Sequence, residues 1–198
     1  MRISGITYKH NKIEDQNTFN ALPEQLQIFL EQINGVVAYK GGLHIRGCCH
    51  SPSWHSLDEA WTGKNAFWKH YPEILDTDIP FGQDCMGDQF LLRNDNVIKL
   101  FSETGELEEL RVDFKNFLQK SEEDPLNFLG MHPLLNYEME KGSLEPWQLL
   151  KASPPFCFQK PGVKLEAVSA EEQIAYLSKL YKEIKKSNGD DQIDFLVS

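Results

Sequence analysis

The sequence lacks most of the features that mark secreted, membrane-spanning and phosphate-binding proteins. It has only four cysteines in 198 residues and no CxxC pair, so we expect reduced thiols and a fold that needs no disulfides. No run approaches the roughly 18 apolar residues of a membrane span, and the first residues lack the apolar core of a signal peptide. We therefore expect a cytoplasmic protein. No GxGxxG or Walker pattern is present, so the pair Gly41-Gly42 is interpreted as a turn.

Basic residues are also scarce. Thirty acidic residues against twenty basic ones give a formal charge of −10, which repels the phosphates of nucleic acids and anionic membrane surfaces. No dense basic patch is evident that would offset this repulsion. We therefore expect neither nucleic acid nor membrane as a partner, whereas a basic protein would be attracted.

What is present fits one folded domain. With 40% hydrophobic residues the chain can bury a substantial core, and single domains commonly reach about 200 residues. No internal repeat or low-complexity tract divides it. We therefore treat residues 1–198 as a single domain.

The central stretch, residues 79–101, predicts a β-hairpin. Two apolar runs, residues 90–92 and 97–101, flank the turn-forming trio Asn94-Asp95-Asn96. Within the second run Lys99 takes an alternate position, which predicts that one strand face is wetter. A second turn signal precedes Leu107, so a third strand there would complete a meander.

The flanking segments supply helices and further strands. Hydrophobic spacing and caps predict helices at residues 23–33, 56–63, 110–118 and 124–130, and a last helix between the cap Ser169 and the terminator Asn188-Gly189. Alternation predicts strands at 36–39, 43–46, 163–167 and 193–197. Residues 131–155 are polar and loop-rich, and we make no assignment there.

The segment between residues 51 and 71 is rich in aromatic side chains. These usually pack in a core or a lid, but partly exposed tryptophans also anchor protein interfaces. Trp54, Trp61 and Trp68 are therefore candidates for partner binding. We expect His55 and His70 to be packing or surface residues, because no matched carboxylate or cysteine motif accompanies them.

Two clusters have residue types that suit chemistry. Cys48-Cys49-His50 followed by His55 suggests zinc, but these spacings do not bring side chains to one point, so we expect no metal and no cofactor. Asp84 and Asp88 are the nearest approach to a paired carboxylate.

Gly82 and Gly87 bracket Asp84 and Asp88, in a segment that glycine allows to bend sharply. Acids four residues apart in such a loop more often shape turns or face water than share a proton. Asp84 and Asp88 are therefore kept as candidate partner-binding residues, with no catalytic residue assigned.

The order of these elements resembles a known family. LPEQLQIFLEQING, a strand pair, an aromatic helical insert, and IPFGQDCMGDQFLLRNDNVIKLF followed by FKNFLQ are similar to the fungal cell-wall assembly regulator family within the SUKH superfamily. The resemblance spans residues 22–118, with 121–198 as an extension of the same domain. It implies an α+β fold with a mixed, largely antiparallel sheet packed by helices. It also implies no catalytic apparatus, since bacterial relatives are mostly thought to be immunity proteins that bind toxin domains and fungal ones look like regulatory scaffolds.

Two functional hypotheses follow. The first is a non-catalytic protein-binding module of immunity or regulatory type, whose negative surface suits a basic partner such as a toxin domain. The second is a hydrolase or transferase that uses Asp84 and Asp88. The sequence leaves the oligomeric state and the identity of the partner open.

Overall fold

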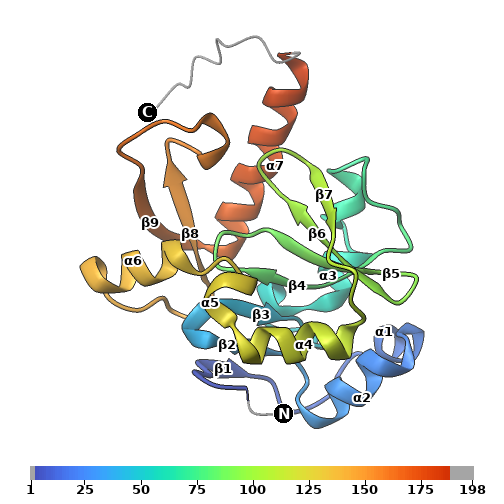
Figure 1. Cartoon of the computed structure of the whole chain (residues 1–198). Coiled ribbons are helices and arrows are strands. Elements are labelled where there is room, and N and C mark those ends of the chain that lie inside the picture. The colour runs from blue at the N-terminus through green and yellow to red at the C-terminus, as the bar shows by residue number, and fades with distance from the viewer. Residues whose placement is uncertain (1–2, 188–198) are drawn as a thin grey trace.

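The computed structural model describes residues 3–187, which form an α+β fold around a seven-stranded sheet (Figure 1). The strands are β1 (Tyr8–Lys9), β2 (Val36–Ala38), β3 (Leu43–Ile45), β4 (Ile79–Asp84), β5 (Gln89–Arg93), β6 (Asn96–Phe101) and β7 (Glu106–Glu109). They lie in the sheet in chain order, and each neighbouring pair is antiparallel. The predicted α+β class and the hairpin with its third strand are confirmed.

Helices cover both faces of the sheet. One face packs against α1 (Gln16–Ala21), α2 (Glu24–Gln32) and α4 (Phe114–Glu123), and the other against the segment after α3 (Leu57–Trp61) and against α7 (Ala170–Lys186). Alternation along the central strands serves both cores, since Phe90 and Val97 face the first layer while Leu91 and Ile98 face the second.

The expectation of a wetter face on β6 is confirmed, because Lys99 and Phe101 are partly exposed whereas Ile98 and Leu100 on the other face are buried. Lys99 takes the polar position, but its side chain is only 13% exposed because it pairs with two carboxylates. Phe101 on the same face is half-buried. The lysine within this apolar run thus marks a largely buried ion pair, on a face that is only modestly more exposed than the other.

The helix starts predicted at Ser56 and Ser169 are confirmed, and Asp113 caps a third helix at a position that the sequence analysis did not single out. Ser56, Asp113 and Ser169 each accept a hydrogen bond from a backbone N–H in the first turn of α3, α4 and α7. The start of α4 differs from the prediction of residue 110, because the chain from Leu110 to Val112 still exchanges backbone hydrogen bonds with Val97. Sheet pairing therefore takes precedence over helical spacing until Asp113.

The C-terminal part combines elements that the sequence predicts with others that it leaves unassigned, and α5 confirms the helix predicted at residues 124–130. It contains α5 (Pro125–Phe128), α6 (His132–Lys141) and a separate two-stranded sheet of β8 (Gln148–Ser153) and β9 (Lys164–Ser169). β9 corresponds to the predicted strand at 163–167, whereas α6 and β8 lie in the unassigned region. The terminator Asn188-Gly189 and the predicted strand at 193–197 fall outside the described residues.

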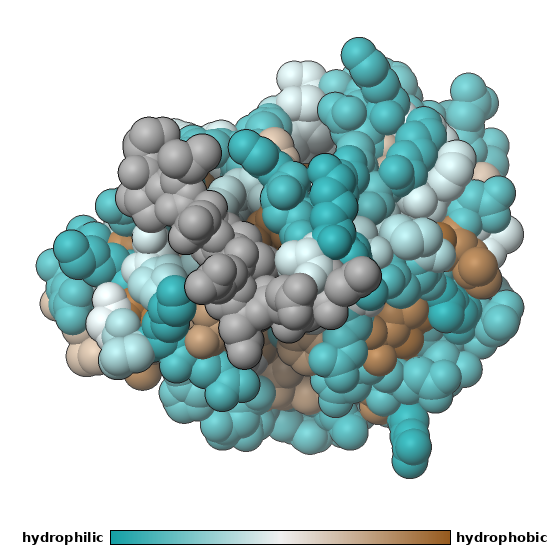
Figure 2. Space-filling model, turned by 90° about the horizontal axis from the view of Figure 1, so that it is seen from above, coloured by the Kyte–Doolittle hydropathy of each residue, from teal (hydrophilic) through white to brown (hydrophobic). Residues whose placement is uncertain are grey.

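The surface is largely hydrophilic on the face seen from above, with separate apolar patches between charged side chains (Figure 2). Within residues 3–187, no helix combines the length and the apolar character needed to cross a bilayer. The largest exposed apolar side chains include Trp147 and Phe156, both from the C-terminal part.

Candidate functional site

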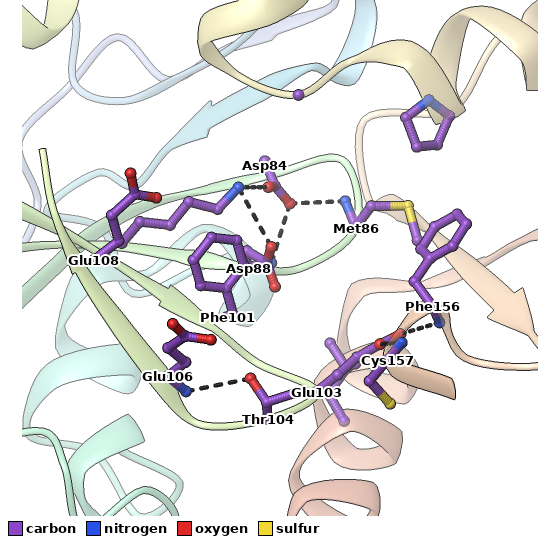
Figure 3. Close-up of a pocket in the computed structure, with 14 residues that line it drawn as sticks. Asp84, Met86, Asp88, Phe101, Glu103, Thr104, Glu106, Glu108, Phe156 and Cys157 are labelled. Atoms are coloured by element: carbon purple, nitrogen blue, oxygen red, sulfur yellow. Dashed lines mark hydrogen bonds and ion pairs between the residues drawn. The ribbon is translucent and has the colours of Figure 1, made fainter. Parts of the chain in front are cut away.

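Asp84, Lys99 and Asp88 form one cluster at the junction of three strands (Figure 3). Lys99 Nζ lies 2.8 Å from Asp84 Oδ2 and 3.3 Å from Asp88 Oδ2. Asp84 ends β4, Asp88 immediately precedes β5, and Lys99 comes from the middle of β6. The structure thus brings the two predicted carboxylates together and adds a cation between them.

Both carboxylates also hold the connecting turn. Asp84 Oδ1 accepts the backbone N–H groups of Met86 at 2.9 Å and of Asp88 at 3.1 Å. Asp88 Oδ1 accepts the N–H of Ser102 at 2.9 Å, which ties the turn to the end of β6. Gly87 adopts a φ of +92°, the left-handed region that side chains disfavour. These contacts support the loop-shaping role expected for this segment.

In this cluster the carboxylates of Asp84 and Asp88 pair with the same cation, Lys99. Burial, and next the charge of Asp84, raise the pKa of Asp88 to about 7, because both disfavour a second carboxylate there. Burial opposes the charged form of Lys99, but Asp84 and Asp88 outweigh it and raise the lysine pKa above its usual range. Lys99 is therefore a permanent cation at neutral pH.

The cluster lies at the base of a cleft of about 580 Å³, which we call the acidic cleft. Of the described residues that line it, five are acidic and Lys99 is the one lysine or arginine; the acids are Asp84, Asp88, Glu103, Glu106 and Glu108. Glu106 and Glu108 are exposed on β7, opposite Phe101 and Lys99 of β6. Phe156 borders the other side and is 42% exposed (Figure 3).

The far wall of the acidic cleft is fixed by Glu103. Its carboxylate accepts the backbone N–H groups of Phe156 at 3.2 Å and of Cys157 at 2.7 Å, which joins the β6–β7 turn to the C-terminal part. Burial, followed by the nearby Glu103, raises the pKa of the Cys157 thiol to about 12. This thiol is therefore protonated at neutral pH and is a poor nucleophile.

The three predicted tryptophans lie elsewhere. Trp54 packs edge-on against Tyr8 and His55, while the half-buried Trp61 donates its indole N–H to the Asp76 carbonyl. Trp68 is 37% exposed and donates to the Trp61 carbonyl. None of the three lines the acidic cleft.

Sequence reasoning missed part of the site. Lys99 was recognised only as a break in an apolar run, and Glu103, Glu106 and Glu108 were not singled out. A signal existed for two of them, because Glu106 and Glu108 alternate along a short strand beside the hairpin.

The suspected zinc residues do not converge. Cys48 and Cys49 are buried, and burial raises their thiol pKa values to about 12 and about 11. His55 instead contacts His44, and His50 is exposed. Within residues 3–187 there is no group of three His, Cys, Asp or Glu side chains placed to hold a metal ion.

No protein-family model matches this chain, and no curated protein is significantly similar to it in sequence. Its function is therefore inferred from the geometry of the site.

Proposed function

We propose that this protein is a non-catalytic protein-binding module of immunity or regulatory type, and that the acidic cleft receives basic side chains of its partner. The observation that carries the proposal is the charge of the cleft, where Lys99 is outnumbered by five carboxylates. The antiparallel α+β architecture agrees with what the SUKH resemblance implies.

The unbalanced charge lies where a partner can reach it. Lys99 is occupied by Asp84 and Asp88, and no ion pair within residues 3–187 neutralises Glu106 or Glu108. A lysine or arginine from a partner would pair with these exposed carboxylates, and an arginine would also stack on Phe156. Such charges chiefly raise the rate of association and select the partner.

The same residues disfavour self-association. β7 is the last strand of the sheet, and three of its four residues are glutamates. An edge strand of one charge repels a second copy of itself, which limits edge-to-edge pairing. An oppositely charged partner meets no such barrier.

A second candidate function rests on Asp88, whose pKa near neutrality is a property of general acids and bases. A hydrolase or transferase that uses Asp84 and Asp88 would need such a group to transfer protons. The structural role of both carboxylates and the protonated state of Cys157 support the binding module instead.

Capture of partners from the native cell, quantified by mass spectrometry, tests the proposal. The cleft variant is Glu106→Gln with Glu108→Gln, and the matched control is Glu24→Gln with Glu31→Gln. The control makes the same change in charge on α2, where neither residue lines the cleft. We expect a basic protein that is bound by the wild type and the control and is lost or strongly reduced with the cleft variant.

Association of the purified pair should slow steeply with added salt, because exposed charges are screened beyond about 10 Å at 0.1 M. A partner retained equally by the cleft variant, or one whose association rate is independent of salt, would overturn the proposal. Turnover of a substrate that is abolished in Asp88→Asn, without loss of stability, would favour the enzyme.

A further inference from the structure

A buried arginine without a carboxylate partner lies away from the acidic cleft. Arg46 follows β3 and is 2% exposed. Its Nη1 donates to the Pro80 carbonyl at 2.7 Å, and its Nη2 donates to the amide oxygens of Gln83 at 2.6 Å and Gln89 at 2.7 Å. All three acceptors are neutral, so they satisfy the hydrogen bonds and leave the charge in place.

The guanidinium is therefore an uncompensated buried cation. Within the described part of the chain, no carboxylate lies within ion-pair distance of Arg46. Burial lowers its pKa to about 9, which still leaves it charged at neutral pH. An isolated buried charge is costly, and natural proteins usually pair it or use it.

Arg46 contributes to the wall of a second pocket of about 540 Å³, which we call the Arg46 pocket. Its guanidinium carbon lies 5.2 Å from the centre of the Phe67 ring, which also lines the pocket. The other apolar lining residues are Trp54, Ala60, Ile174 and Ala175. A volume of this size falls within the range of small-molecule sites, roughly 300–1,000 Å³.

The pocket also has basic residues at its edge. Lys179 and Lys182 are exposed on α7, and the Lys182 Nζ lies 3.4 Å from His70 Nδ1. No ion pair within residues 3–187 neutralises either lysine. They can therefore contact an incoming anion directly, while Arg46 acts through its field.

Three glutamates line the Arg46 pocket as well, and all are exposed. Glu183 pairs with Lys186, whereas Glu171 accepts only the neutral Ser53 hydroxyl and keeps its charge. Exposed carboxylates are well screened, whereas the buried charge of Arg46 acts in a medium of low dielectric constant. The interior of the pocket is therefore positive in a chain that is strongly negative.

We propose that the Arg46 pocket binds a small organic anion with an apolar body. The acidic group would pair with Lys179 or Lys182 within the field of Arg46, and the apolar body would lie against Trp54, Phe67 and Ile174. The site is separate from the acidic cleft: Leu177 of α7 lines the cleft, whereas Ile174 and Ser178 of the same helix line this pocket. The inference does not rest on the proposed function.

Titration with 8-anilinonaphthalene-1-sulfonate, an anion with a flat apolar body, tests the site in the full chain. We expect saturable binding at one site per chain with a rise in probe fluorescence. Phenyl phosphate or benzoate should displace the probe, and benzyl alcohol, which is neutral, should not. Comparison of the two anions distinguishes a phosphate ligand from a carboxylate ligand.

Variants locate the binding. Ala175→Trp adds a bulky side chain to the wall of the pocket and keeps Arg46, and Ala21→Trp on α1 is its matched control because Ala21 is also exposed but does not line the pocket. Lys182→Glu reverses an edge charge, and Lys115→Glu on α4 makes the same change elsewhere. We expect Ala175→Trp and Lys182→Glu to weaken probe binding roughly tenfold, a difference of about 1.4 kcal/mol, while both controls retain it.

Arg46→Met should also abolish binding if it folds, and circular dichroism decides whether that variant is interpretable. Unchanged binding in Ala175→Trp, or equal displacement by benzyl alcohol, would overturn the proposal. Binding that never saturates would do the same, because it would show non-specific adsorption of the probe.

Discussion

His44 and His55 share a hydrogen bond in the protein interior, with His44 Nε2 2.8 Å from His55 Nδ1 and the ring planes 13° apart. Gln83 Nε2 lies 3.2 Å from His44 Nδ1, and His55 Nε2 lies 3.4 Å from the Asn34 carbonyl. Because Arg46 donates to Gln83 Oε1, the Gln83 amide nitrogen must point toward His44. Gln83 then donates to His44, His44 donates to His55, and His55 donates to the Asn34 carbonyl. Each ring therefore donates from one nitrogen and accepts at the other, as a neutral imidazole does.

This arrangement predicts a loss of stability in acid. Burial lowers the pKa of His55 to about 4, because an imidazolium there would lack water; burial, and next the charge of His55, lower the pKa of His44 well below its ordinary value. The unfolded chain therefore takes up protons first, near pH 6.5. The free energy of unfolding is therefore unaffected by His55 titration above pH 6.5 and falls as the pH drops from 6.5 toward 4. The loss due to His55 is about 3 kcal/mol at most.

Denaturant midpoints between pH 7.5 and 4.5 measure this effect. Other groups titrate in the same range, so His55→Gln is the comparison, since it removes the titration. The wild type should lose more stability than His55→Gln over this range. Parallel curves for the two proteins, or a His55 pKa near 6.5 by nuclear magnetic resonance, would contradict the prediction.

Asp88→Asn should cost little stability, whereas Asp88→Ala should lose about 1 kcal/mol or more. Asparagine keeps an acceptor for the Ser102 N–H and removes the repulsion with Asp84. Alanine leaves that backbone donor without its partner. Denaturant midpoints at pH 7 compare the two variants, and an equal loss in both would show that the charge matters more than the acceptor.

Gly87→Ala should destabilise the fold for two reasons. The φ of +92° is unfavourable for alanine, and a Cβ there would lie 2.9 Å from Leu177 Cδ1. Gly130→Ala is the matched control, because its φ of +68° is also positive but a Cβ would meet no atom within 4 Å. We expect a loss of about 1–3 kcal/mol at Gly87 and a smaller loss at Gly130. Equal losses in thermal or chemical unfolding would show that contact with α7 adds nothing.

The purified protein should contain no stoichiometric zinc. Zinc binds the thiolate, and burial holds the thiols of Cys48 and Cys49 protonated at neutral pH. Elemental analysis of protein prepared without chelators measures the content. One zinc per chain that disappears in Cys48→Ser would refute the prediction.

Local signals in the sequence determined much of the secondary structure. The hairpin around Asn94-Asp95-Asn96, the caps at Ser56 and Ser169 and the spacing of α2 each depend on interactions within a few residues, so they can be recognised without the fold. The α+β class follows from the same local patterns. Asp84 and Asp88 could be singled out because they lie in one short loop.

The tertiary structure alone decided how distant residues meet. Lys99 reaches Asp84 only because β4, β5 and β6 pair in register. The guanidinium of Arg46 is likewise held in place by Gln83 and Gln89, which come from two neighbouring strands. The assignments of α6 and β8 also required the structure, since their few buried side chains are held by contacts with β9 and Cys85. The local periodicity of the sequence shows which face of an element is apolar. The burial, ion pairing and charge balance of its side chains depend on which other elements the fold places opposite that face.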